Sequence, residues 1–135
     1  MIDHKVIKLA SERKYFGLKK TYTHYSKVKN VKCGDIIEVE LKVISNKIMS
    51  FHYETNGCVY CQASANILAN KIRLTTIEDL NRDIDLIQLW LKNNKLSFPN
   101  KFKTLIILFK KENNGRFECI MLPIKAVLKA LKTPT

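Results

Sequence analysis

The chain lacks a long apolar run. Its longest uninterrupted apolar stretch, Leu105–Phe109, covers five of 135 residues, whereas a membrane-spanning helix needs about 20. Residues 1–5 also lack the continuous apolar region of a secretory signal. We therefore expect one domain over residues 1–135, located in the cytoplasm and not in a membrane.

Acidic residues and arginine are also scarce. Twelve Asp and Glu stand against 24 Lys and Arg, which leaves a formal net charge of +12, and only four of the basic residues are arginines. Base recognition favours arginine, and the lysines are scattered along the chain. The composition thus favours a solvated basic surface, or one that meets an acidic protein, over a nucleic-acid interface. A basic, zinc-stabilised nucleic-acid-binding module stays an alternative, and it predicts affinity that falls steeply with salt.

The hydrophobic pattern predicts a small antiparallel sheet. Residues 36–44 and 47–55 each alternate apolar and polar side chains, and Ser45-Asn46 between them has turn character. The Thr- and Tyr-containing segment 21–29 is predicted as an edge strand. The alternation leaves Glu40 on a wet face and puts Met49 on the same face as its apolar neighbours, Phe51 and Tyr53.

Helices are predicted around this sheet, so the class is α+β, a three-stranded antiparallel sheet covered on one face by helices. An amphipathic pattern predicts the first helix over residues 2–15. A helix is predicted after Cys58, with its apolar face over residues 63–72. A capping box at Thr75 and Glu78 predicts the start of a long helix with apolar residues over 80–91. A further short helix is predicted over residues 102–111, ended by Asn113-Asn114-Gly115. The last helix covers residues 122–131, with Pro123 in its first turn.

All four cysteines occupy turn-like or helix-start positions, namely Cys33, Cys58, Cys61 and Cys119. In a reducing compartment such thiols are interpreted as metal or redox groups before disulfides. Because an antiparallel hairpin returns the chain to its starting edge, Cys33 and Cys58 are predicted at the same end of the sheet. The unpaired N–H groups of a helix start, with Arg116 nearby, are predicted to favour the thiolate of Cys119.

Asp35 can add a carboxylate oxygen to these sulfurs, as zinc sites accept. A hard oxygen among soft sulfurs makes a weaker and more exchangeable site. The sequence therefore predicts a Cys/Asp site for zinc or an iron–sulfur cluster.

Three motifs occur in a specific order: Cys33-Gly34-Asp35 before a strand, Gly57-Cys58 before a helix that contains Ala63-Ser64, and Arg116 three residues ahead of Cys119 and a hydrophobic helix. In this order they resemble the U-type iron–sulfur scaffold proteins, that is IscU, SufU and the N-terminal domain of NifU. The resemblance runs from about Val31 to Leu131.

The resemblance implies a scaffold and not an enzyme. It implies that Cys33, Cys58 and Cys119 bind a nascent 2Fe-2S cluster or zinc, with Asp35 as a ligand or a labilising neighbour. The implied partners are a cysteine desulfurase, which donates sulfur, and apo iron–sulfur proteins, which accept the cluster. A close variant is a zinc-bound sulfur acceptor of the SufU type.

Cys61 departs from the family, which usually has Ser or another small residue at this position. Three interpretations stay open: a fourth sulfur ligand in place of Asp35, a partner for a reversible disulfide with Cys58, or an inert buried residue. A disulfide oxidoreductase built on the CxxC step is a further class, but no thioredoxin-like context surrounds it.

The histidines His4, His24 and His52 are separated in sequence and are predicted as surface residues. Glu118 stands where some family members have His or Lys, which argues against a mechanism that needs a basic neighbour there.

Overall fold

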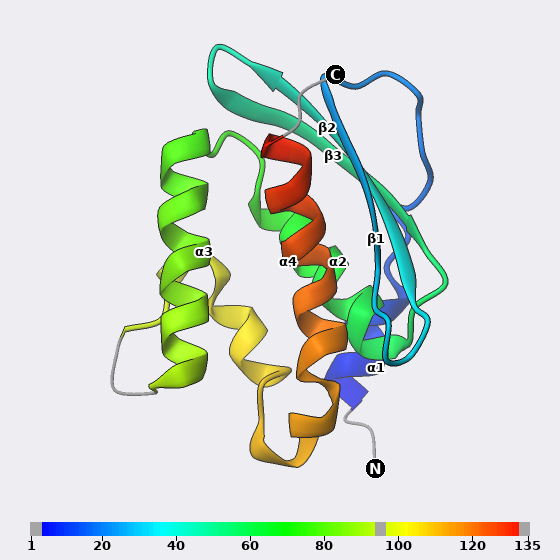
Figure 1. Cartoon of the computed structure of the whole chain (residues 1–135), viewed down its shortest axis with the longest axis vertical. Coiled ribbons are helices and arrows are strands. Elements are labelled where there is room, and N and C mark those ends of the chain that lie inside the picture. The colour runs from blue at the N-terminus through cyan, green and yellow to red at the C-terminus, as the bar shows by residue number, and fades with distance from the viewer. Residues whose placement is uncertain (1–3, 94–96, 133–135) are drawn as a thin grey trace.

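The computed structural model describes residues 4–93 and 97–132 and has three layers. A three-stranded antiparallel sheet forms the first, with strand order β1 (His24–Lys29), β2 (Ile36–Ile44) and β3 (Lys47–Thr55). Helices α2 (Val59–Lys71) and α4 (Phe117–Lys132) cover one face of the sheet, and α3 (Ile77–Lys92) lies beyond them (Figure 1). The predicted α+β class and sheet are confirmed.

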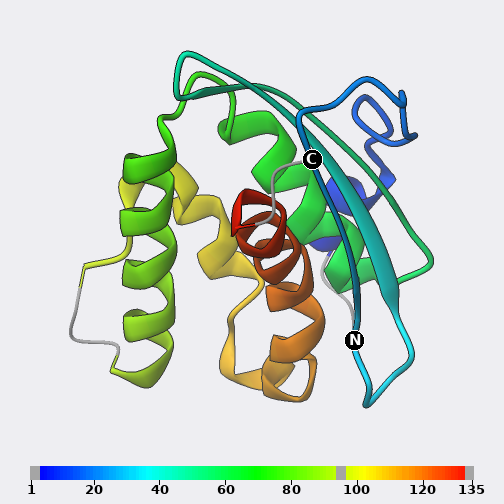
Figure 2. The ribbon, with the colours of Figure 1, turned by 45° about the horizontal axis from the view of Figure 1, so that its top comes forward.

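The core lies between the sheet and the helices. Along β2 the inward side chains Ile37, Val39 and Leu41 are fully buried. Helix α2 is buried along nearly its whole length because its small residues let β3, α4 and α1 (His4–Ser11) pack closely around it. The turned view shows α2 enclosed between the sheet and α4 (Figure 2). No helix among the described residues is long and apolar enough to cross a membrane.

The β2–β3 hairpin has the predicted limits but contains a bulge. Lys42 pairs with Ser50 while Val43 pairs with Ile48, so Met49 is an extra residue on β3. The extra residue reverses the alternation, and Ile48 is buried where Met49 was predicted to point inward. The prediction for Met49 was wrong because strict alternation holds only within an unbroken register.

The prediction that Glu40 faces water was also wrong. Residues 12–23 leave α1, pair with the free edge of β3 through Gly17 N and Tyr53 O at 2.8 Å, and cross the outer face of the sheet (Figure 1). There the backbone N–H of Lys19 donates to Glu40 Oε1 at 2.8 Å, and Glu40 is only 2% exposed. A carboxylate on this face is buried because backbone donors satisfy it.

Helix α1 is shorter than the predicted helix over residues 2–15. It ends at Ser11, and the predicted start at residue 2 lies outside the described residues. The buried Asn66 side chain on α2 donates to the carbonyls of Leu9 and Glu12 at 2.6 and 3.0 Å. The helix ends there because a side chain, and not a further turn, takes its last carbonyls.

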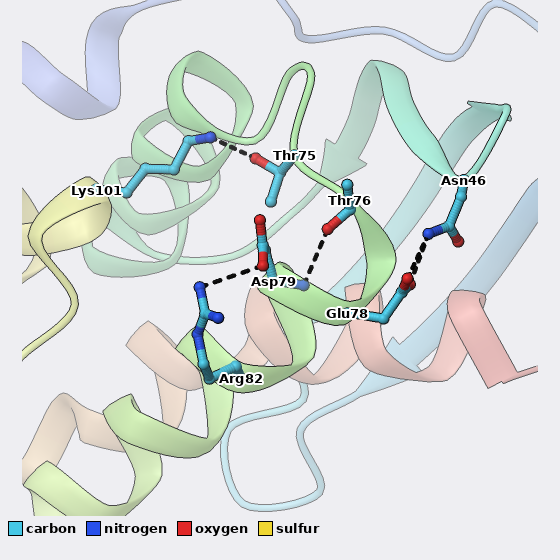
Figure 3. A network of polar contacts seen from close by, with 7 residues as sticks. All are labelled: Asn46, Thr75, Thr76, Glu78, Asp79, Arg82 and Lys101. Carbon is cyan, nitrogen blue, oxygen red and sulfur yellow. Dashed lines mark hydrogen bonds and ion pairs between the residues drawn. The ribbon is translucent and has the colours of Figure 1, made fainter.

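The cap of α3 lies one residue later than predicted. Thr76 is the N-cap, and its Oγ1 accepts a hydrogen bond from Asp79 N at 3.1 Å (Figure 3). Thr75 is buried, its carbonyl accepts from Ile48 N at 2.9 Å, and its hydroxyl accepts from Lys101 Nζ at 2.6 Å. The pairing with β3 holds Thr75 outside the helix.

The predicted helix over residues 102–111 is instead a 3₁₀ helix that ends earlier, η1 (Asn100–Ile107), and a second 3₁₀ helix, η2 (Lys111–Arg116), begins where the predicted helix was to end. The predicted stop at Asn113–Gly115 lies inside η2. Helix α4 then begins at Phe117, five residues before the predicted start, so Pro123 lies in its second turn. Pro123 has no N–H to donate to the carbonyl of Cys119, which is therefore freed from the helical ladder.

Candidate metal centre

The loop between β1 and β2 carries Cys33 and Asp35 in a tight turn. Asn30 N donates to Asp35 O at 2.8 Å, and Gly34 N donates to Asn30 O at 2.7 Å. Lys32 N donates to Asn30 Oδ1 at 3.1 Å. Gly34 has φ of +77°, a left-handed conformation that favours glycine. The Cys-Gly-Asp order thus places a thiol and a carboxylate, both of types that can bind a metal, on the two sides of the residue that makes the turn.

Cys58 reaches the same end of the sheet from β3. Thr55 Oγ1 donates to Ile36 O at 2.6 Å, and Ile36 N donates to Asn56 Oδ1 at 2.8 Å, so the end of β3 is tied to the start of β2. Cys58 is the N-cap of α2, and its N–H points to Asp35 Oδ2 at 3.4 Å. The hairpin therefore brings Cys58 next to Asp35, 23 residues away in sequence.

Cys119 comes from the first turn of α4 and is only 4% exposed. Ser64 Oγ on α2 donates to the next residue's carbonyl, Ile120 O, at 2.6 Å. Across the outside of the site, Lys32 Nζ lies 3.2 Å from Glu118 Oε1. Each member of this ion pair directly precedes a cysteine, Cys33 or Cys119. The packing of α4 therefore brings the third thiol to the β1–β2 loop that carries Cys33.

The ligand atoms of Cys33, Asp35 and Cys119 all lie within 4.8 Å of one another. The two sulfurs of Cys33 and Cys119 are 4.0 Å apart, although 86 residues separate them in sequence. Sulfurs bound to one tetrahedral zinc ion are about 3.8 Å apart, since each Zn–S bond is about 2.3 Å. These three donors fit a single metal with little movement. Cys58 is not part of this group, but it lies next to two of its members, Asp35 and Cys119.

The electrostatics of Cys119 differ from the sequence-based expectation. Burial, followed by the neighbouring Cys58 and Cys33 thiols, raises the pKa of Cys119 to about 12. A helix start was predicted to favour the thiolate, but desolvation and neighbouring sulfurs outweigh it. Arg116 is exposed on η2, where solvent screens its charge. A metal ion would supply the positive charge that makes this thiol release its proton.

Cys61 lies beneath the other thiols and is wholly buried. Its sulfur is 3.7 Å from Thr55 Oγ1, and burial raises the pKa of Cys61 to about 12. A Cβ added to Gly57 would lie 2.8 Å from both Cβ and Sγ of Cys61. Gly57 is therefore required for close packing of the two segments, a role that the sequence analysis did not identify.

The histidines do not join the cysteines. His4 is exposed, His24 Nδ1 is 2.8 Å from the hydroxyl of Thr23, and His52 lies on β3 away from the helices. Burial lowers the pKa of His52. The Lys32–Glu118 ion pair has no signal in the sequence, because it joins residues that only the tertiary fold brings together.

Known proteins resemble this chain over most of its length. The family described as the NifU-like N terminal domain matches residues 2–92. The iron-sulfur cluster assembly scaffold protein IscU of Thermotoga maritima is 26% identical over 133 residues, which cover 98% of this chain and 93% of that protein.

Two solved structures share the fold. A NifU-like N-terminal protein from Brucella abortus has a TM-score of 0.83 at 18% identity, covering 96% of this chain and 91% of that one. A putative scaffold protein for the SUF system from Fervidobacterium islandicum also has a TM-score of 0.83, at 23% identity and with 96% of both chains covered.

Proposed function

Because this chain belongs to the NifU-like N-terminal domain family, we propose that it is a scaffold on which an iron–sulfur cluster is assembled. The cluster is cargo: it is built on the protein and then passes to an apo-protein. The similarity to the IscU scaffold of Thermotoga maritima supports this function. The observation that carries it is the gathering of the Cys33, Asp35 and Cys119 ligand atoms within 4.8 Å of one another.

Cys33, Cys58 and Cys119 are the proposed sulfur ligands, and Asp35 is the proposed fourth ligand. Three of these groups come from connections at one end of the sheet and one from the first turn of α4. A site with one oxygen and an exposed Cys33 can open on its solvent side. Such a site holds its cargo less firmly than four thiolates would, which suits transfer.

The proposed partners follow from this role. A scaffold requires a sulfur donor, for which we propose a cysteine desulfurase, and apo iron–sulfur proteins as acceptors. The free thiols of the site suit a reducing compartment such as the cytoplasm. The role consists of binding and transfer, and no substrate turnover is assigned to it.

A zinc-bound sulfur acceptor is the second candidate. Three sulfurs and one carboxylate form a donor set that zinc accepts in four-coordinate sites. In that role, zinc would hold the thiolates until one of them accepts sulfur.

The test is anaerobic incubation of the reduced protein with ferrous iron and sulfide, followed by addition of an apo-ferredoxin. A scaffold develops a visible absorption band that then moves to the ferredoxin. Asp35→Ala should keep the band and slow its transfer, because an oxygen ligand is the weak point of the site. Tightly bound zinc in the purified protein, with no absorption band, would instead favour the second candidate.

A further inference from the structure

The start of α2 carries two thiols of different accessibility, and the proposed cluster site uses only one of them. Cys58 is partly exposed at the N-cap, whereas Cys61 is wholly buried one turn later. We infer that Cys61 is a resolving thiol: it attacks a persulfide carried by Cys58 and releases the sulfur as sulfide for cluster assembly. The inference rests on the proposed scaffold function and adds a reductive step to it.

The helix start places the two cysteines at bridging distance. Gln62 N donates to Cys58 O at 3.0 Å, so the first helical turn already begins at Cys58. Residues three apart on such a turn have Cα atoms about 5 Å apart. Disulfides need a Cα separation of about 4.4 to 6.8 Å. A Cys58–Cys61 disulfide therefore requires rotation of side chains and no movement of α2.

The burial of Cys61 assigns different roles to the two thiols. Its sulfur packs against Gly57 and lies 3.7 Å from Thr55 Oγ1. An external sulfur donor reaches Cys58 and not Cys61, because thiol exchange depends on access. Once Cys58 carries a second sulfur, the buried thiols of Cys119 and Cys61 are both its neighbours, and Cys61 is the one of the two that the proposed cluster site does not use. The buried thiol of Cys61 therefore reacts only with the persulfide on Cys58.

The step balances without an outside oxidant. The Cys61 sulfur attacks the Cys58 Sγ of the persulfide, the S–S bond to the outer sulfur breaks, and a Cys58–Cys61 disulfide forms. The two cysteine sulfurs lose two electrons, and the outer sulfur gains them to become sulfide. The proton of Cys61 ends on the released sulfide. A small thiol or dithiol reductant then restores both cysteines.

The test uses metal-free, reduced protein and one equivalent of glutathione persulfide without oxygen. We expect the unchanged chain to release sulfide and to show a Cys58–Cys61 link in peptide mass spectrometry. Cys61→Ser should keep a persulfide on Cys58 and release sulfide at least about tenfold more slowly, since the thiol held one helical turn from Cys58 is then missing. Val59→Ala, which alters the same turn but keeps both thiols, should behave as the unchanged chain.

Equal sulfide release by Cys61→Ser, or a Cys58–Cys119 link in the unchanged chain, would overturn the inference. Incubation with ferrous iron and inorganic sulfide separates this failure from failure of the scaffold proposal. Inorganic sulfide is already reduced, so Cys61→Ser should form the same absorption band as the unchanged chain. Loss of the band in this variant would make Cys61 a ligand and also overturn the inference. Absence of the band in both proteins would contradict the scaffold function itself.

Discussion

The two ends of β2 differ in that only one of them gathers thiols. At the Asn46 end, Asn46 Nδ2 donates to Glu78 Oε1 at 2.6 Å, and Lys101 donates to the hydroxyl of Thr75 (Figure 3). At the Cys33 end, the Cys33 and Cys119 thiols make only a weak contact with each other at 4.0 Å. Polar groups that satisfy one another stabilise the fold, whereas thiols in weak contact keep their capacity to bind a metal.

Thiols also differ from other polar groups in what their burial costs before a metal binds. A thiol is a weak hydrogen-bond donor and behaves as a small apolar group, so its burial leaves no strong polar group unsatisfied. A carboxylate in the position of Cys119 would need hydrogen-bond donors, such as the backbone N–H of Lys19 that donates to Glu40. Sulfur ligands can therefore be gathered at little cost before the metal arrives.

The largest expected effect is at the Cys33 end. Cys33→Ser should lower metal affinity at least about 100-fold, because loss of a direct ligand exceeds the effect of losing a ligand's supporting partner. The melting temperature of the metal-free protein should stay the same, since Cys33 is exposed. Competition with a chelator measures the metal affinity, and thermal unfolding in EDTA measures the melting temperature of the metal-free protein. Unchanged affinity would remove Cys33 from the site.

Gly57→Ala tests whether packing also supports the thiols. The new methyl group would lie 2.8 Å from the Cys61 side chain and 3.0 Å from Thr55 Oγ1. Overpacking of this kind costs about 1 to 3 kcal/mol of unfolding free energy. Urea unfolding of the metal-free protein is the measurement. Gly115→Ala is the matched control, because nothing lies within 4 Å of its added Cβ. Equal stability of the two variants would mean that Gly57 has no packing role.

Thr76→Ala should affect stability but not metal binding. It removes the hydroxyl that accepts from Asp79 N at 3.1 Å, and loss of an N-cap costs about 1 kcal/mol. Thr76→Ser keeps the oxygen and should retain most of the stability. Metal affinity by chelator competition should match that of the unchanged chain. A fall in affinity would show that the two ends of β2 are coupled.

The smallest effect is expected for the ion pair over the site. Lys32 and Glu118 are 3.2 Å apart with side chains 76% and 49% exposed. Solvent and salt screen such a pair, so a double-mutant cycle with Lys32→Ala and Glu118→Ala should give a coupling below about 1 kcal/mol. The coupling should shrink further at high salt. A larger, salt-independent value would show that the pair holds the two cysteine loops together.

Much of the fold was predictable because its signals are local. Alternation in residues 36–44 and 47–55 predicted both strands with their observed limits. The predictions failed where a distant segment changed the local preference. The bulge at Met49 broke the alternation, the backbone of Lys19 buried Glu40, and pairing with Ile48 moved the α3 cap from Thr75 to Thr76.

The candidate site was predictable to different degrees. The hairpin alone implied that Cys33 and Cys58 share one end of the sheet, because antiparallel pairing requires it. The place of Cys119 rested on a resemblance, since no local pattern relates a residue on α4 to a loop 86 residues earlier. The role of Cys61 stayed open because sequence shows its spacing from Cys58 but not its burial.

By itself, the sequence determined the elements at the site: a turn that glycine permits at Gly34, a hairpin that aligns Cys33 with Cys58, and a helix that follows Cys58. These depend on backbone preference and on the spacing of apolar side chains, which act over a few residues. Only the tertiary structure decided the distance between the Cys33 and Cys119 sulfurs and the protonation of the buried thiols. Both quantities depend on desolvation and on groups that meet through space, and packing of α4 and α2 against the sheet creates those surroundings.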